Sequence, residues 1–287
     1  MIRKVGVIGA GTIGTGLTEL LSEHGIDVIV TDKNQEILDK AKENLIHNFD
    51  KAIEKFGITD SEKKLYLSKV TYTMDKTKFK DVDLLIEAVD EIMELKKEIF
   101  MEMDKICKEE ILFATSTSTL SITELGAATS RADKIIGLHM THPVVKRDLV
   151  QIIRGLKTSD QTFNEAKAFV EQIGKTGIQV FESPGYVTVR LMMPLINEAI
   201  RLVNEGVASA EDIDTAMKLG FDFPYGPLEM ADRMGLDSVL RVMEMLFKEY
   251  GEVRYRPALM VKKLVNAGHL GEKTNEGFFK YENGERI

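Results

Sequence analysis

The stretch Arg3-Lys-Val-Gly-Val-Ile-Gly-Ala-Gly-Thr-Ile-Gly14 decides the fold of this chain. A short run rich in β-branched residues ends at Gly9, and a helical pattern of apolar residues begins directly after Gly11. Gly9, Gly11 and Gly14 form the pattern G-x-G-x-x-G at this strand-to-helix turn. The first glycine allows a tight turn, the second lets the backbone approach a pyrophosphate, and the third allows close helix packing. The pattern favours a dinucleotide-binding site.

An acidic residue closes the next strand. Asp27-Val-Ile-Val-Thr31 predicts that strand, and Asp32 follows it, 18 residues beyond Gly14. A carboxylate at this place accepts hydrogen bonds from the adenine ribose hydroxyls and repels a 2′-phosphate. We therefore expect NAD rather than NADP as the cofactor.

Apolar runs recur along the first part of the chain and alternate with helical stretches. They predict further strands at 82–88, 111–114, 134–139, 149–154 and 177–182. This alternation indicates an α/β fold, a Rossmann-type doubly wound parallel sheet with covering helices. After Ser183-Pro-Gly185 almost every segment has helical periodicity. We expect an NAD-binding domain over residues 1–183 and an all-α domain over residues 184–287.

Composition and net charge limit the classes of partner that this chain can bind. Hydrophobic residues make up 44% of the chain and charged residues 29%, as in soluble globular proteins. The net charge of -8 argues against nucleic acid and anionic membranes, and no apolar run approaches the ~18 residues of a membrane span. A strand pattern starts at the first residues without a signal peptide, so we expect a cytoplasmic protein. The one cysteine, Cys107, is interpreted as a packed thiol, and no metal site is expected.

Further segments resemble the 3-hydroxyacyl-CoA dehydrogenase family. The resemblance is collinear over essentially the whole chain. Its segments are Ala114-Thr-Ser-Thr-Ser-Thr-Leu-Ser-Ile-Thr123, Ile136-Gly-Leu-His139, Glu182-Ser-Pro-Gly-Tyr-Val187, Glu211-Asp-Ile-Asp-Thr-Ala-Met-Lys-Leu-Gly220, Tyr225-Gly-Pro-Leu-Glu229 and Lys273-Thr-Asn-Glu-Gly-Phe-Phe-Lys-Tyr281.

The resemblance implies the roles of particular residues. His139 would be the base for the hydroxyl proton, a task that suits a side chain whose pKa lies near the working pH. Ser118 would bond the substrate oxygen. Beyond the glycine loop, Glu91, Lys96 and Lys273 stand where the family contacts the cofactor. The resemblance also implies a cleft between the domains and a homodimer formed largely through the helical domain.

The resemblance includes departures around this site. Gln151 stands where the family has a glutamate that bonds the catalytic histidine; it can still orient His139 but carries no charge. Ser116 and His142 stand in place of asparagines on the cofactor side of the site, and Val189 replaces an asparagine that holds the reacting oxygen. These changes favour a rebuilt polar pocket or, alternatively, weakened activity.

Three functions follow from these observations. The first is NAD-dependent oxidation of a short 3-hydroxyacyl thioester such as 3-hydroxybutyryl-CoA. The second is the same oxidation of a polar acyl group, glyceryl, on an acyl carrier protein of a polyketide extender-unit pathway. The third is a structural or regulatory NAD-binding protein without turnover.

Overall fold

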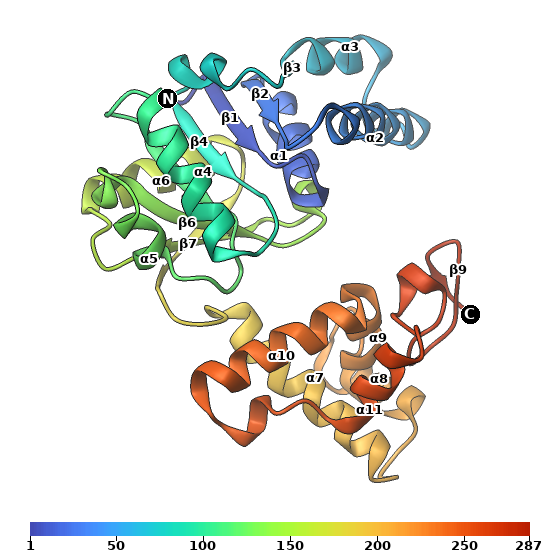
Figure 1. Ribbon diagram of the computed structural model, residues 1–287. Coiled ribbons are helices and arrows are strands. Elements are labelled where there is room, and N and C mark those ends of the chain that lie inside the picture. Colours follow the sequence, from blue (N-terminus) through green and yellow to red (C-terminus); the bar gives the residue numbers. More distant parts are fainter. The chain divides into compact units, whose positions relative to one another are not determined.

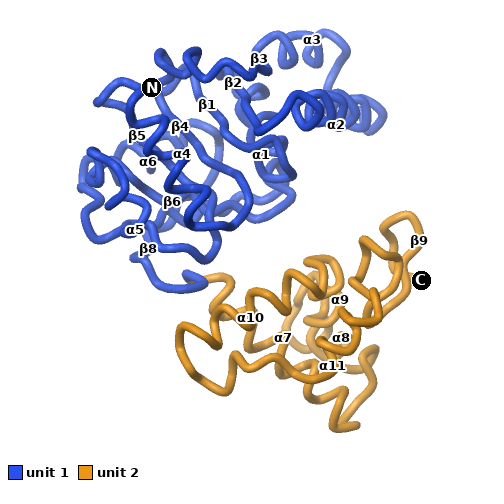
Figure 2. The backbone as a smooth tube through the Cα atoms, in the orientation of Figure 1, with its two compact units in different colours: residues 1–186 blue, residues 187–287 orange.

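The computed structural model describes residues 1–287, which form two compact units, Met1–Tyr186 and Val187–Ile287 (Figure 2). The division falls three residues after the boundary expected at residue 183. The intervening residues stay with the first unit because their contacts lie there. The hydroxyl of Tyr186, the last of them, donates to the carbonyl of Leu120 at 3.4 Å.

The first unit is built on an eight-stranded sheet in the order β3-β2-β1-β4-β5-β6-β7-β8 (Figure 1). The strands are β1 (Lys4–Ile8), β2 (Asp27–Thr31), β3 (Val70–Tyr72), β4 (Leu84–Glu87), β5 (Leu112–Thr115), β6 (Ile135–Met140), β7 (Leu149–Arg154) and β8 (Thr176–Phe181). The central strands are buried on both faces, which explains why their sequences are apolar throughout rather than alternating. The α/β class expected from the sequence is confirmed.

One pair of strands departs from the expected parallel arrangement. β6 and β7 run antiparallel, whereas the other neighbouring pairs in the sheet are parallel. The segment between them spans only residues 141–148. A parallel connection needs a crossover of a dozen or more residues, so the short segment makes the chain turn back.

Helices cover both faces of the sheet. One core cluster joins the sheet to α1 (Thr12–Glu23), α2 (Gln35–Glu54) and α6 (Asp160–Gln172), and the other joins it to α4 (Met93–Ile106) and α5 (Ile122–Ala127). Cys107 is buried in the second cluster, and burial raises the pKa of its thiol to about 11, as suits a packed thiol.

The segment between β2 and β3 contains two helices. α2 begins at an Asn34 cap, and α3 (Asp60–Ser68) begins at a capping box formed by Thr59 and Glu62. α3 leads directly into β3, whose three residues are too few to give a recognisable pattern in the sequence.

The second unit is helical, as expected. Its helices are α7 (Thr188–Asn204), α8 (Ala210–Phe221), α9 (Pro227–Met234), α10 (Leu236–Tyr250) and α11 (Leu259–Asn266), followed by a hairpin of β9 (Tyr281–Glu282) and β10 (Glu285–Arg286). Two buried carboxylates join its parts: Asp214 accepts the backbone N–H groups of Leu228 and Glu229, and Asp232 accepts those of Phe278 and Phe279. None of the chain's helices combines the length and apolar content that crossing a bilayer requires.

Candidate active site

The glycine loop joins β1 to α1 in the conformation that its sequence predicts. Gly9 has a φ of +102°, which favours glycine, and a Cβ at Gly14 would overlap the carbonyl oxygen of Gly9. A Cβ at Gly11 would meet no atom within 4 Å, so this face of the loop is open. Gly11 is the N-cap of α1 and offers no side chain to cap it, and the first turn of α1 has no acidic residue. Its first N–H groups therefore remain available to an anion.

Asp32 is fixed at the end of β2 by the backbone. Its Oδ2 accepts the N–H of Ala10 at 2.6 Å, and its Oδ1 accepts the N–H of Lys33 at 2.6 Å. Each carboxylate oxygen keeps a further lone pair for ribose hydroxyls, while a phosphate group would meet like charge.

A cavity of about 280 Å³ adjoins this loop. Asp32 and the glycine loop form its polar side, and Leu95 and Ile99 of α4 are among its apolar walls. A carboxylate for the ribose, apolar walls for a flat base and free helix N–H groups for phosphates together fit the adenosine diphosphate half of NAD.

His139 lies near the end of β6, and Gln151 lies opposite it on β7. The two residues are direct partners in the antiparallel ladder, which explains their spacing of 12 residues along the chain. The amide nitrogen of Gln151 lies 2.7 Å from Nδ1 of His139, and both side chains are buried. The expected pairing of these two residues is therefore present.

Burial makes His139 a weak base in the free protein. It lowers the pKa of His139 to about 4, against an opposing effect of Glu91. The ring therefore stays neutral at physiological pH. Gln151 supports either neutral tautomer, because a half-turn of its amide exchanges donor and acceptor. With the oxygen toward Nδ1–H, Nε2 is free to accept a proton.

Ser118 lies in the loop that follows β5, and this loop is held by Glu91. Oε1 of Glu91 accepts bonds from the N–H and Oγ of Ser118 at 2.9 and 3.3 Å. The same oxygen accepts the hydroxyl of Thr117 at 2.6 Å and the N–H of Thr119 at 3.0 Å. One carboxylate thus fixes three consecutive residues around the proposed substrate-binding serine.

Lys96 lies beneath this loop and is fully buried. Its Nζ lies 2.6 Å from Oε1 of Glu87, 3.2 Å from the carbonyl of Val89 and 3.5 Å from Oε2 of Glu91. Glu87, also fully buried, accepts the hydroxyl of Thr115 at 2.6 Å through its other oxygen. Direct cofactor contacts by Glu91 and Lys96 stay predictions from the resemblance.

The remaining site residues lie as follows. Ser116 is half-buried next to β5, its N–H donating to the carbonyl of Glu87 at 2.8 Å, and His142 is exposed at the start of the β6–β7 connection. Lys273 and Val189 belong to the second unit. There, Lys273 pairs with Asp237 at 2.5 Å, and Val189 packs against the helical core. Their proposed roles at the site stay predictions.

Two residues near the site were not singled out from the sequence. Glu87 ends the otherwise apolar strand β4. A charged residue in a buried strand could have indicated from the sequence that Glu87 has a specific partner. Tyr186 follows Pro184-Gly185 with a φ of +48°, and its ring centroid lies 5.6 Å from that of His139.

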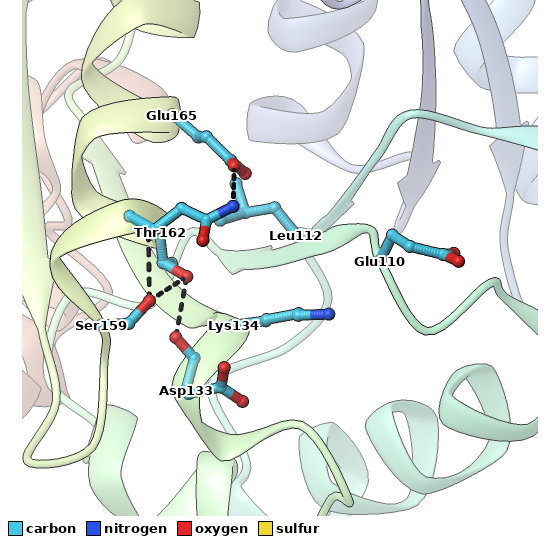
Figure 3. Close-up of a pocket in the computed structure, with 8 residues that line it drawn as sticks. Glu110, Leu112, Asp133, Lys134, Ser159, Thr162 and Glu165 are labelled. Atoms are coloured by element: carbon cyan, nitrogen blue, oxygen red, sulfur yellow. Dashed lines mark hydrogen bonds between the residues drawn. The ribbon is translucent and has the colours of Figure 1, made fainter.

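A second cavity, of about 210 Å³, lies apart from these residues (Figure 3). It is lined by residues near the starts of β5, β6 and α6, such as Leu112, Lys134 and Ser159, whereas the glycine loop and His139 lie at strand ends. Ser159 and Thr162 bond to each other and to neighbouring groups inside it, as helix-capping residues do. We do not assign the active site here.

The fold and site together define a nucleotide-dependent dehydrogenase. Gly9 follows β1, Ser118 lies in the loop after β5, and His139 lies near the end of β6. These three strands belong to the parallel part of one sheet. Their carboxyl ends meet at one edge, where open α/β sheets bind ligands. A nucleotide loop, a hydroxyl donor and an imidazole at that edge suit hydride transfer coupled to proton transfer.

Comparison with known proteins gives the family. Residues 4–183 match the NAD binding domain of 3-hydroxyacyl-CoA dehydrogenase, and residues 185–281 match its C-terminal domain. A 3-hydroxybutyryl-CoA dehydrogenase of Clostridioides difficile is 42% identical over 97% of this chain and 99% of the relative. The crystal structure of (S)-3-hydroxybutyryl-CoA dehydrogenase from Ralstonia eutropha is 41% identical, with a TM-score of 0.93 over 99% of this chain and 100% of that one. The chain belongs to the 3-hydroxyacyl-CoA dehydrogenase family, and the expected NAD-binding domain is confirmed.

Proposed function

We propose that this protein oxidises short 3-hydroxyacyl-CoA thioesters, such as 3-hydroxybutyryl-CoA, with NAD. The observation that carries the proposal is the buried His139–Gln151 pair, which lies at the same sheet edge as the glycine loop. Relatives that match essentially the whole chain are named for 3-hydroxybutyryl-CoA, which supports coenzyme A as the carrier.

The residues of the first unit divide the chemistry between them. The hydroxyl of Ser118 turns from Glu91 to the substrate oxygen, donates a hydrogen bond to it and aligns it, while the N–H of Ser118 stays bonded to Glu91. His139 accepts the hydroxyl proton at Nε2 as the carbonyl forms, and Gln151 holds the ring by bonding Nδ1. Asp32 and the start of α1 would hold the ribose and phosphates of NAD, which would supply the hydride acceptor for the carbon that bears the hydroxyl.

We also infer that the protein is a homodimer joined through its helical unit. Several large apolar side chains of this unit are exposed in the single chain, among them Leu191, Leu219, Phe221 and Leu259. Exposed apolar groups of this kind suit a protein interface. Light scattering of the purified protein should give twice the mass of one chain.

The proposal is tested by following NADH formation over a panel of substrates. The panel contains 3-hydroxybutyryl-CoA, its analogue with a 2-hydroxyl group, and the same acyl groups on an acyl carrier protein. We expect turnover with the coenzyme A esters. If only the acyl groups on the carrier protein are oxidised, the substrate is an acyl carrier protein thioester and not a coenzyme A ester. Tight NAD binding without turnover on any thioester would indicate a structural or regulatory protein.

A further inference from the structure

His139 receives little electrostatic help from its nearest partners. Gln151, from β7, is a neutral amide. Tyr186, from the segment before α7, packs against His139 with the two ring centroids 5.6 Å apart. Burial raises the pKa of its phenol, so Tyr186 also stays neutral. When His139 takes a proton, the new positive charge lies in a buried site between two uncharged side chains. Such a charge is costly unless an anion lies near it.

Glu91, from the loop before α4, can act as that anion. Burial lowers the pKa of His139, and the charge of Glu91 opposes this effect. The same charge raises the pKa of Tyr186, which contacts His139, so Glu91 acts on both rings. The hydroxyl of Tyr186 donates to the carbonyl of Leu120. Glu91 accepts the N–H of Thr119, the residue before Leu120.

The surroundings of Glu91 keep it ionised. Burial raises its pKa, but Lys96 and the hydrogen bonds from Thr117, Thr119 and Ser118 outweigh burial and lower it. Lys96 lies closer to Glu87, at 2.6 Å, than to Glu91, at 3.5 Å. Lys96 is therefore paired mainly with Glu87, and the carboxylate of Glu91 is the more weakly paired of the two. The side chain of Glu91 is 29% exposed, so its field is only partly screened by water.

We propose that Glu91 is a positioning residue for proton transfer, which holds Ser118 in place and supplies the negative charge that stabilises protonated His139. This inference rests on the proposed function. During oxidation the substrate O–H bond breaks and its proton goes to Nε2 of His139, while the C–H hydrogen leaves with its electron pair to NAD. The substrate becomes a ketone, NAD is reduced, and the imidazolium is the charge that Glu91 stabilises.

The first test measures the titration of the His139 ring by NMR in the protein without substrate. The chain has five histidines, so a His139→Gln variant identifies the signal. Gln151→Glu should raise the midpoint into an accessible range, because it places a carboxylate on Nδ1. Adding Glu91→Gln should then lower that midpoint by at least ~0.5 pH unit, the lower end of what a nearby charge does. Glu94→Gln, which removes an exposed charge three residues away, is the control and should leave it unchanged.

The second test measures turnover of the same variants with NAD and 3-hydroxybutyryl-CoA. Glu91→Gln should lower kcat at least ~10-fold, in addition to any rise in the KM for NAD that the loss of its predicted cofactor contact causes. Gln151→Glu should recover most of this loss in the double variant, because it returns the charge to the same imidazole.

Three outcomes would overturn the inference. If Glu91→Gln leaves the His139 midpoint unchanged, Glu91 exerts no charge effect on the ring. If Glu91→Gln changes only the KM for NAD, Glu91 is a cofactor contact. If Gln151→Glu does not recover the lost turnover, Glu91 only supports the loop. The titration needs no turnover. A protein that titrates as expected but oxidises no thioester would contradict the proposed function and leave this electrostatic link intact.

Discussion

At the scale of single residues, His139 shows how burial sets both chemistry and stability. Its pKa is lowered to about 4 in the folded protein, whereas an unfolded histidine titrates near ~6.5. A neutral ring at physiological pH can accept a proton directly. The low pKa also makes a proton-accepting role harder, because the imidazolium must form in a buried place.

The same pKa predicts how stability depends on pH. The unfolded state binds a proton to this ring more tightly than the folded state, so stability should fall as pH drops from ~6.5 toward 4. The contribution of His139 is about 1.4 kcal/mol per pH unit in this window. Urea unfolding of wild type and His139→Gln measures it, since other titrating groups cancel in the difference. Equal pH slopes for the two proteins would show that the ring is not shifted.

Asp32 is the residue that we predict to determine the choice between NAD and NADP. Asp32→Ala should lose NAD affinity, while NADP binding holds or improves because the negative charge is gone. Asp32→Asn retains one oxygen acceptor and should lose less NAD affinity, and the exposed Asp39→Ala serves as the control. Fluorescence titration with both cofactors gives the comparison. If wild type binds NAD and NADP equally, Asp32 is not the discriminating group.

At the scale of elements, the buried pair Glu87–Lys96 joins β4 to α4, and Glu87 also bonds Thr115 of β5. Lys96→Met should destabilise the protein by about 3–5 kcal/mol, since it leaves the Glu87 carboxylate buried without its partner. Lys97, the next residue of α4, forms a more exposed ion pair with Glu124. Lys97→Met breaks this pair and should lower the free energy of unfolding by less than ~1 kcal/mol. Denaturant unfolding distinguishes them. The prediction fails if both variants lose the same stability.

The sequence predicted some elements well because their signals are local. The turn between β1 and α1 and the strand β2 depend on residues near one another in the chain. The apolar run of β7 does not give its direction, but the short segment between the predicted strands 134–139 and 149–154 excludes a parallel crossover. Lys96 looked like a cofactor contact by resemblance, and only the fold shows its buried bond to Glu87. Contacts of this kind join residues through tertiary packing and leave no pattern in sequence.

At the scale of the whole molecule, the two units have different tasks. The first unit holds the nucleotide loop, Ser118 and His139, and the second is a helical body whose predicted contributions are the dimer contacts and Lys273. Buried Asp214 and Asp232 tie the second unit together, so it has its own core. The family match extends across both units, which supports a single catalytic function for the complete chain.

The central claim is that this protein oxidises a 3-hydroxyacyl-CoA with His139 as the base. The most direct measurement is the rate of NADH formation from 3-hydroxybutyryl-CoA by wild type and His139→Ala. NAD affinity is measured in parallel, and His269→Ala, at a half-buried histidine of the second unit, is the control. We predict a loss of at least ~100-fold in turnover for His139→Ala, with NAD affinity nearly unchanged. Normal turnover by His139→Ala would contradict the account and place the chemistry on another residue.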